Sequence, residues 1–228
     1  MTAGSSRDPG RRAGATDLLA PVVRAAQGLT GLTVDREFEE RFRRYLELLT
    51  LWNKTHRLTG VTTAAEIVRG LFVDSLLFLP LIPPGSVRIV DIGAGAGFPG
   101  VPMCIAMPRT QVFLVEARRK PVSFLRTLVR ELGLQGLRVA EGRAEELAAD
   151  VVSAFGPADA VVTRGVGGFG RLLPTAVEFL RPGGIFIASG PPPGSQSRER
   201  DVAGLVWTTK DYPRLGLRRQ FLIGSRPS

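Results

Sequence analysis

The sequence has almost none of the residues that bind metals or form disulfides. Its 228 residues include one cysteine, Cys104, and one histidine, His56. A disulfide framework needs paired cysteines and a structural zinc site needs about four cysteine or histidine ligands, so both are excluded. We expect a protein without a metal that works in the cytoplasm, where thiols stay reduced.

Long apolar runs are also missing. The longest candidate, residues 71–82, is interrupted by Asp74 and is shorter than the roughly 18 to 20 apolar residues that a membrane-spanning helix needs. Hydrophobic residues make up 44 % of the chain and charged residues 22 %, which is typical of a globular domain and not of a disordered chain. We therefore expect a soluble protein with no membrane partner, and we interpret it as a monomer.

Acidic residues are outnumbered by basic ones. Lysine and arginine together number 30 against 21 aspartates and glutamates, which gives a net charge of +9. The excess lies toward the two ends, because residues 1–34 hold four basic and two acidic side chains and residues 181–228 hold eight and three. This charge favours a polyanionic partner such as nucleic acid, although a GC-rich genome also enriches arginine.

The N-terminal third is predicted to be helical. Residues 1–15 are small, polar and basic and indicate a disordered tail, and residues 16–84 indicate a helical cap. The first cap helix is expected to begin at Thr16 or Asp17, both of which are good N-caps. In residues 35–54 the apolar side chains recur with a period close to that of an α-helix, which predicts an amphipathic helix.

A third cap helix is predicted to begin after Thr63. Its hydroxyl and Glu66, three residues later, match the capping box that often starts a helix. We expect this helix to run to about Ile82, where residues 83–85 (Pro-Pro-Gly) stop it.

Residues 85–228 show short apolar runs that alternate with helix-length segments. The runs are VRIVDI, QVFLVEA, LRVAEG, ADAVVTR and GIFIAS, with LRRQFLIGS as a last strand. Such alternation predicts a doubly wound α/β fold with a mostly parallel, Rossmann-like sheet.

A glycine-rich loop over residues 90–100 follows the first predicted strand. Gly93, Gly95 and Gly97 let the backbone turn sharply and approach a ligand at the carboxyl end of that strand. The spacing from Gly95 to Gly100 also fits a dinucleotide fingerprint, so NAD is one interpretation, and a glycine turn without a ligand is another.

Neighbouring residues favour S-adenosylmethionine (SAM) over NAD. The Asp91 carboxylate suits a positively charged methionine moiety but would repel a pyrophosphate at the helix N-terminus; its alternative role is to cap the turn. Glu116, at the end of the second strand, could accept both ribose hydroxyls or be a surface acid. The junction at residues 180–184 resembles that of class I methyltransferases, so we expect the class I SAM-dependent methyltransferase fold.

The residues near the expected methyl site favour an acceptor with a free lone pair. The N-P-P-aromatic motif that serves exocyclic amines is absent after the fourth strand, where residues 162–165 read VTRG. Cys104 is more consistent with a buried structural thiol than with a nucleophile. Guanine N7 fits these constraints, in a loop or as a flipped base. Arg164 would lie against the guanine or a phosphate, or form a structural salt bridge.

Further candidates lie outside this centre. Ala144 and Glu145 follow the third strand, where the adenine would lie, although acidic residues there also favour a helix N-terminus. Basic residues could contact the RNA backbone or simply be solvated surface. These residues are Lys54, His56, Arg57, Arg118, Arg119, Lys120, Arg218 and Arg219.

Over about residues 38–190 the chain resembles the RsmG (GidB) family of 16S ribosomal RNA guanine-N7 methyltransferases. The matching segments are Trp52-Asn53-Lys54, Leu58-Thr59, Asp74-Ser75-Leu76, residues 91–100 (DIGAGAGFPG), Leu114-Val115-Glu116, Lys120, Phe124-Leu125, Arg143-Ala144-Glu145 and Arg164. The resemblance implies cofactor and active-site contacts at Gly93, Phe98, Ala144, Glu145 and Arg164. It also implies 16S rRNA or the small ribosomal subunit as partner, with guanine 527 of the 530 loop as the methylated base.

The chain departs from the family pattern mainly on the substrate side. The family usually has Asn where Arg57 stands, His where Leu71 stands, a basic residue where Pro121 stands, S-R-A at residues 163–165 and K-G at residues 189–190. A methyltransferase for another RNA, a protein or a small molecule therefore stays open. So do a non-catalytic RNA-binding protein and, less consistently with Asp91, an NAD dehydrogenase.

Overall fold

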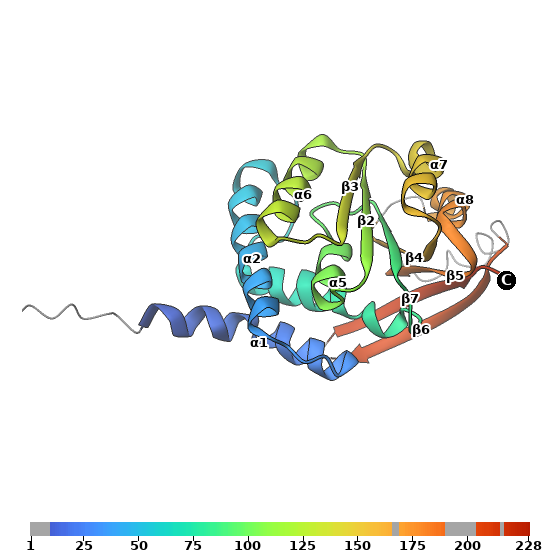
Figure 1. Cartoon of the computed structure of the whole chain (residues 1–228). Helices are drawn as coiled ribbons and strands as arrows, with labels where there is room; N and C mark the ends of the chain where they lie inside the picture. The colour runs from blue at the N-terminus through green and yellow to red at the C-terminus, as the bar shows by residue number, and fades with distance from the viewer. Residues whose placement is uncertain (1–9, 166–168, 190–203, 215–216) are drawn as a thin grey trace, which may run out of the picture.

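The computed structural model describes residues 10–165, 169–189, 204–214 and 217–228. Its centre is one sheet with the strand order β3-β2-β1-β4-β5-β7-β6 (Figure 1). The first five strands are parallel, and β7 is antiparallel to both of its neighbours. The strands are β1 (Arg88–Ile92), β2 (Gln111–Glu116), β3 (Leu137–Glu141), β4 (Ala158–Arg164), β5 (Leu180–Ser189), β6 (Val206–Arg214) and β7 (Leu217–Ser225).

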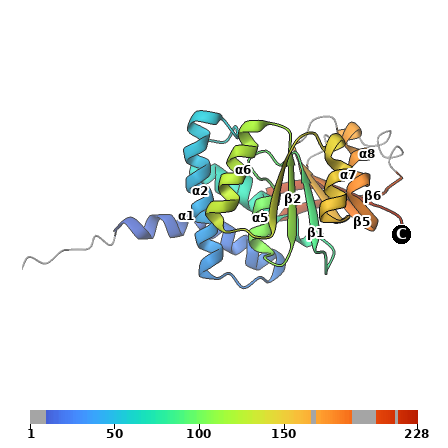
Figure 2. The same cartoon turned by 45° about the horizontal axis from the view of Figure 1, so that its top comes forward.

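Helices cover both faces of the sheet (Figures 1 and 2). Side chains alternate along each strand, so Ile89 joins the apolar core under the cap, and Val90 joins the core under the last two helices. The cap side has α1 (Gly10–Thr30), α2 (Arg36–His56), α5 (Gly100–Ala106) and α6 (Arg119–Leu132), and the other side has α7 (Ala144–Phe155) and α8 (Phe169–Phe179). The predicted doubly wound, mostly parallel fold is confirmed.

Two predictions about the cap need correction. Helix α1 begins at Gly10 and not at Thr16 or Asp17, so residues 10–15 of the expected tail are helical. These residues include two arginines and two alanines, which are good helix formers.

No helix among the described residues is long and apolar enough to cross a membrane.

The third cap helix begins as predicted but is not a uniform α-helix. Thr63 and Glu66 form the expected capping box. The segment then passes through α3 (Ala64–Ile67), the π-helical turn η1 (Val68–Val73), α4 (Asp74–Leu76) and the 3₁₀ turn η2 (Leu79–Leu81). A π turn redirects backbone carbonyls, and such turns are frequent at functional sites.

Helix α2 is followed by its C-cap residue Arg57, which has the left-handed backbone angles φ 48° and ψ 54°. A side chain with a Cβ is strained there, whereas glycine is not. We expect Arg57→Gly to raise the free energy of unfolding by about 0.5 to 1 kcal/mol, measured by urea denaturation. Arg57→Ala removes the same charge but keeps a Cβ and should gain nothing; equal effects of the two substitutions would contradict the strain argument.

Candidate functional site

The glycine loop joins β1 to α5 at the point where the strand order reverses from β1 to β4. Gly93, Gly95 and Gly97 have positive φ values of 73°, 56° and 103°. A Cβ on Gly97 would lie 2.6 Å from Val101 Cγ2, whereas a Cβ on Gly95 would meet nothing closer than 3.8 Å. The loop is therefore packed against the protein at Gly97 and open at Gly95, where a ligand can approach.

Asp91 is completely buried beneath this loop. Its Oδ2 accepts a hydrogen bond from the Gly100 amide at 2.8 Å, which is the turn-capping role considered above. Its Oδ1 has no hydrogen-bond partner in the described part of the chain. Burial raises the pKa of the carboxyl to about 7, with a smaller contribution from the nearby charge of Glu116. A buried oxygen without a donor suits a cationic ligand group.

Glu116 is also buried, so its interpretation as a surface acid is wrong. Its Oε2 accepts from the Gly95 amide at 2.8 Å, and its Oε1 accepts from the Arg118 amide at 2.9 Å and from Arg118 Nε at 3.0 Å. The carboxylate thus fixes the open part of the glycine loop. Two oxygens have about four lone-pair sites, so capacity remains for a sugar hydroxyl.

Three predicted cofactor contacts differ in accessibility. Phe98 is buried between the rings of Tyr45 and Phe72, with centroid distances of 5.4 and 6.0 Å, so its ring packs against the cap. Ala144 is buried at the first turn of α7. Glu145 beside it is exposed and lies 3.5 Å from Arg143. Only Glu145 of these three side chains is freely accessible.

Arg164 is held by the cap. Its Nη2 donates to the Gly70 carbonyl at 2.8 Å and its Nη1 to the Leu71 carbonyl at 3.4 Å, both in the π-helical turn. Its Nε lies 3.2 Å from Asp74 Oδ2. Burial lowers the pKa of the guanidinium, and Asp74 opposes this shift. The structure therefore shows the salt bridge, and a contact of Arg164 with the guanine or a phosphate stays a prediction.

Arg219, predicted as a contact to RNA, also pairs with Asp74, through its Nε and Asp74 Oδ1. One buried carboxylate of the cap thus joins two arginines, one at the end of β4 and one on β7. Contact of Arg219 with RNA stays a prediction, because its side chain remains partly exposed beside this ion pair. The side chain of Arg218 lies outside the described residues.

The other basic candidates come together at one end of the molecule. Helices α2 and α6 run antiparallel, because Trp52 lies 5.5 Å from Phe124 and Arg44 lies 2.8 Å from Glu131. The C-terminus of α2 therefore lies beside the N-terminus of α6, which follows the strand ending at Glu116. The exposed basic residues at these two helix ends are Lys54, His56, Arg57, Arg118, Arg119 and Lys120.

Sequence analysis missed two buried polar residues that shape the site. Tyr45 lies in the helix predicted over residues 35–54, and its Oη donates to the Ala96 carbonyl in the glycine loop at 2.6 Å. The sequence places Asp74 only as a break in an apolar run and as part of a family segment. The sequence did contain a signal for both residues. A hydroxyl and a carboxylate each lie on the apolar face of a predicted helix, where burial requires a polar partner.

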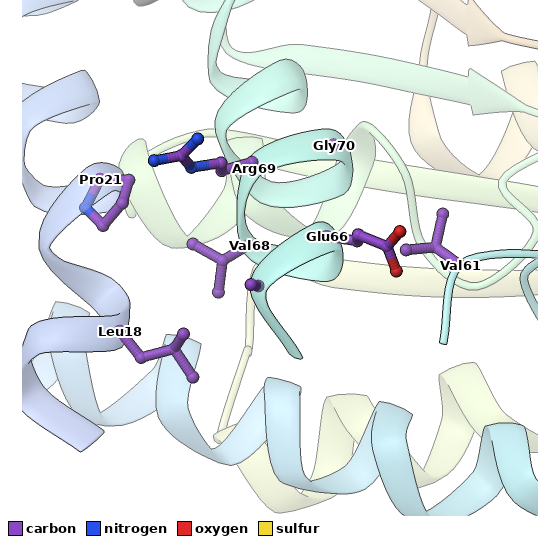
Figure 3. A pocket seen from close by; sticks show the side chains of 8 residues that line it. Leu18, Pro21, Val61, Glu66, Val68, Arg69 and Gly70 are labelled. Atoms are coloured by element: carbon purple, nitrogen blue, oxygen red, sulfur yellow. The ribbon is translucent and has the colours of Figure 1, made fainter. Parts of the chain in front are cut away.

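A cavity of about 720 Å³ lies between α1 and residues 61–70 (Figure 3). Its lining includes no residue of the glycine loop, and Gly70, which lines it, also accepts a hydrogen bond from Arg164. The lining residues are Leu18, Pro21, Val61, Ala65, Glu66, Val68, Arg69 and Gly70.

Cys104 and the metal-binding residue types add no reactive site to the described part of the chain. Cys104 is buried in α5, and burial raises the pKa of its thiol to about 11, as expected for a structural cysteine. Within the described ranges, no group of three or more His, Cys, Asp or Glu side chains could hold a metal ion.

Residues 38–197 match the model of the GidB family, described as rRNA small subunit methyltransferase G. A protein of Xanthomonas euvesicatoria named ribosomal RNA small subunit methyltransferase G is 40 % identical over 172 residues, which is 75 % of this chain and 78 % of that protein. One of the same name from Stenotrophomonas maltophilia is 38 % identical over 162 residues, covering 71 % and 73 %.

Solved structures agree on the fold. The O-methyltransferase TomG of Streptomyces achromogenes, crystallised with SAM, has a TM-score of 0.56 at 14 % identity and covers 89 % of this chain and 94 % of its own. TrmN of Thermus thermophilus has a TM-score of 0.54 at 18 % identity and covers 68 % and 48 %. The predicted class I methyltransferase fold is confirmed.

Proposed function

Because the chain belongs to the GidB family, rRNA small subunit methyltransferase G, we propose that it is a SAM-dependent enzyme that methylates 16S rRNA at guanine N7. The finer assignment, guanine 527 of the 530 loop, follows from the family resemblance. The observation that supports the activity best is the glycine loop, which is open at Gly95 and has a buried, unpaired carboxylate oxygen of Asp91 beneath it.

The residues around the loop fit SAM. The negative charge of the buried Asp91 carboxylate would attract the methionine ammonium group, and Glu116 would hold the ribose while keeping Gly95 in place. Gly93 and Gly97 allow the positive φ angles of the loop, and Phe98 would support the loop by packing against the cap. The first turn of α7, with Ala144 and Glu145, would border the adenine.

SAM, when bound, supplies a methyl group on a sulfonium, which the lone pair of guanine N7 can accept without losing a proton. No general base is therefore required, and the task of the chain is to align the acceptor. The exposed basic residues at the ends of α2 and α6 would hold the RNA backbone beside the glycine loop. Arg164 would support this alignment indirectly, by fixing the cap against β4.

The direct test is incubation of the purified protein with methyl-labelled SAM and small ribosomal subunits that lack this modification. We expect label in N7-methylguanosine that maps to the 530 loop, and no label in subunits already modified. Label at another base would show a different RNA specificity. SAM binding without any label would overturn the rRNA assignment and favour a different acceptor or a non-catalytic RNA-binding protein.

Substitution of Glu116 tests its place in the cofactor site. Glu116→Gln keeps the shape but removes one acceptor and the negative charge that holds Arg118. We expect about tenfold weaker SAM binding by calorimetry, since a charged hydrogen bond contributes roughly 1.5 to 3 kcal/mol. Glu141→Gln, at the register-matched end of β3, is the control and should bind SAM normally; equal loss in both variants would argue against this role.

A further inference from the structure

Tyr45 is a cap residue whose hydroxyl reaches into the glycine loop. The side chain is completely buried in α2, and its Oη donates to the Ala96 carbonyl at 2.6 Å. A Cβ on Gly97 would lie 2.8 Å from the same Oη. The hydroxyl therefore occupies the space beside two consecutive loop residues.

The ring of Tyr45 holds the next loop residue. It stacks on Phe98 with an interplanar angle of 12° and a centroid distance of 5.4 Å. It also packs against Phe72 of the π-helical turn at 4.9 Å. One side chain of the cap thus contacts the loop at Ala96, Gly97 and Phe98.

A phenylalanine would fill the same apolar space but would leave the Ala96 carbonyl without this donor, whereas the hydrogen bond offsets the cost of burying the hydroxyl. The hydrogen bond of this hydroxyl goes to the Ala96 carbonyl of the loop backbone. Glu116 fixes the amide of Gly95 from β2, and Tyr45 fixes the carbonyl of the next residue from the cap. The two contacts hold adjacent residues of the loop from two different elements.

We propose that Tyr45 is a positioning residue that holds the glycine loop in its SAM-binding conformation, so that the helical cap sets the affinity for the cofactor. This inference rests on the proposed SAM-dependent function. Tyr45 does not touch the reacting atoms in this proposal; it acts through the backbone of residues 96–98.

The test compares Tyr45→Phe, which removes only the hydroxyl, with Leu49→Ala, which opens a cavity at another buried position of the same helix. We expect Tyr45→Phe to raise the SAM dissociation constant and the KM for SAM about tenfold, the equivalent of about 1.4 kcal/mol. The kcat at saturating SAM and the KM for ribosomal subunits should stay within about twofold of wild type, since the RNA surface is unchanged. Leu49→Ala should lower the melting temperature but leave SAM affinity unchanged.

Two results would overturn the proposal: SAM binding by Tyr45→Phe as tight as by the wild type, or a loss of affinity in both variants that follows their loss of stability. The second result would mean that Tyr45 acts only by packing. Absence of SAM binding by the wild-type protein itself would instead overturn the proposed cofactor, so the two failures can be told apart.

Discussion

Asp74→Ala should lower the free energy of unfolding by about 3 to 5 kcal/mol, a large fraction of the stability of a domain of this size. The carboxylate is almost fully buried and pairs with the guanidinium groups of both Arg164 and Arg219. Its removal would leave two like charges close together with no counter-charge. The loss can be measured by urea denaturation at neutral pH.

Asp150→Ala is a matched control, because Asp150 is an exposed aspartate in α7. This substitution should change the free energy of unfolding by no more than about 0.5 kcal/mol. A loss below about 1 kcal/mol for Asp74→Ala would show that the Asp74 ion pairs are solvated like ordinary surface pairs.

Asp91→Asn should weaken SAM binding about 100-fold. The amide keeps an oxygen for the Gly100 hydrogen bond but places an uncharged donor where the unpaired carboxylate oxygen now lies. Removing one partner of a buried charge pair costs about 2 to 5 kcal/mol, which includes the factor of 100 expected here. Calorimetric titration with SAM measures the effect.

Asp159→Asn is the control for this change, because Asp159 caps the backbone of Val87 and Arg88 at the opposite end of the sheet. It should lose stability and keep normal SAM affinity. Asp91→Asn should instead lose SAM affinity without losing stability, since it removes a buried charge from the ligand-free protein. Unchanged SAM binding by Asp91→Asn would exclude the proposed attraction of the ammonium group by Asp91.

The same carboxyl predicts a pH dependence. Its pKa rises from 3.8 to about 7 on folding, so its cost to stability grows as pH rises from about 4 to 7 and is constant above that. SAM binding requires the ionised form and should weaken about tenfold per pH unit below 7. Binding near pH 6.5 should release a proton, which calorimetry in two buffers of different ionisation enthalpy detects, and Asp91→Asn should show no such release.

The strands and helix starts that have a clear pattern in the local sequence could be predicted. Six of the seven strands are apolar runs bounded by turn residues, and the capping box at Thr63 marks a real helix start. Strand β6 was missed because residues 206–214 (VWTTKDYPR) are polar and include a proline. Its pairing with β7 at the edge of the sheet, and not an apolar run, makes it a strand.

The candidate site was predictable as a location but not in its contacts. The glycine spacing and the strand ends identify the loop, Asp91 and Glu116 correctly as neighbours. The partners of Arg164 are not visible in the sequence, because Gly70 is 94 residues away. The same separation explains why the π-helical turn was expected to be an ordinary helix.

The ion pair between Asp74 and Arg219 also bears on the order of folding. These residues are 145 positions apart, and closing so long a chain segment is slow and entropically costly. We expect the parallel strands to assemble first and the cap to dock last. In the transition state Asp74 would then not yet be paired with Arg164 and Arg219. Loss of Asp74 should then mainly accelerate unfolding and leave the refolding rate nearly unchanged.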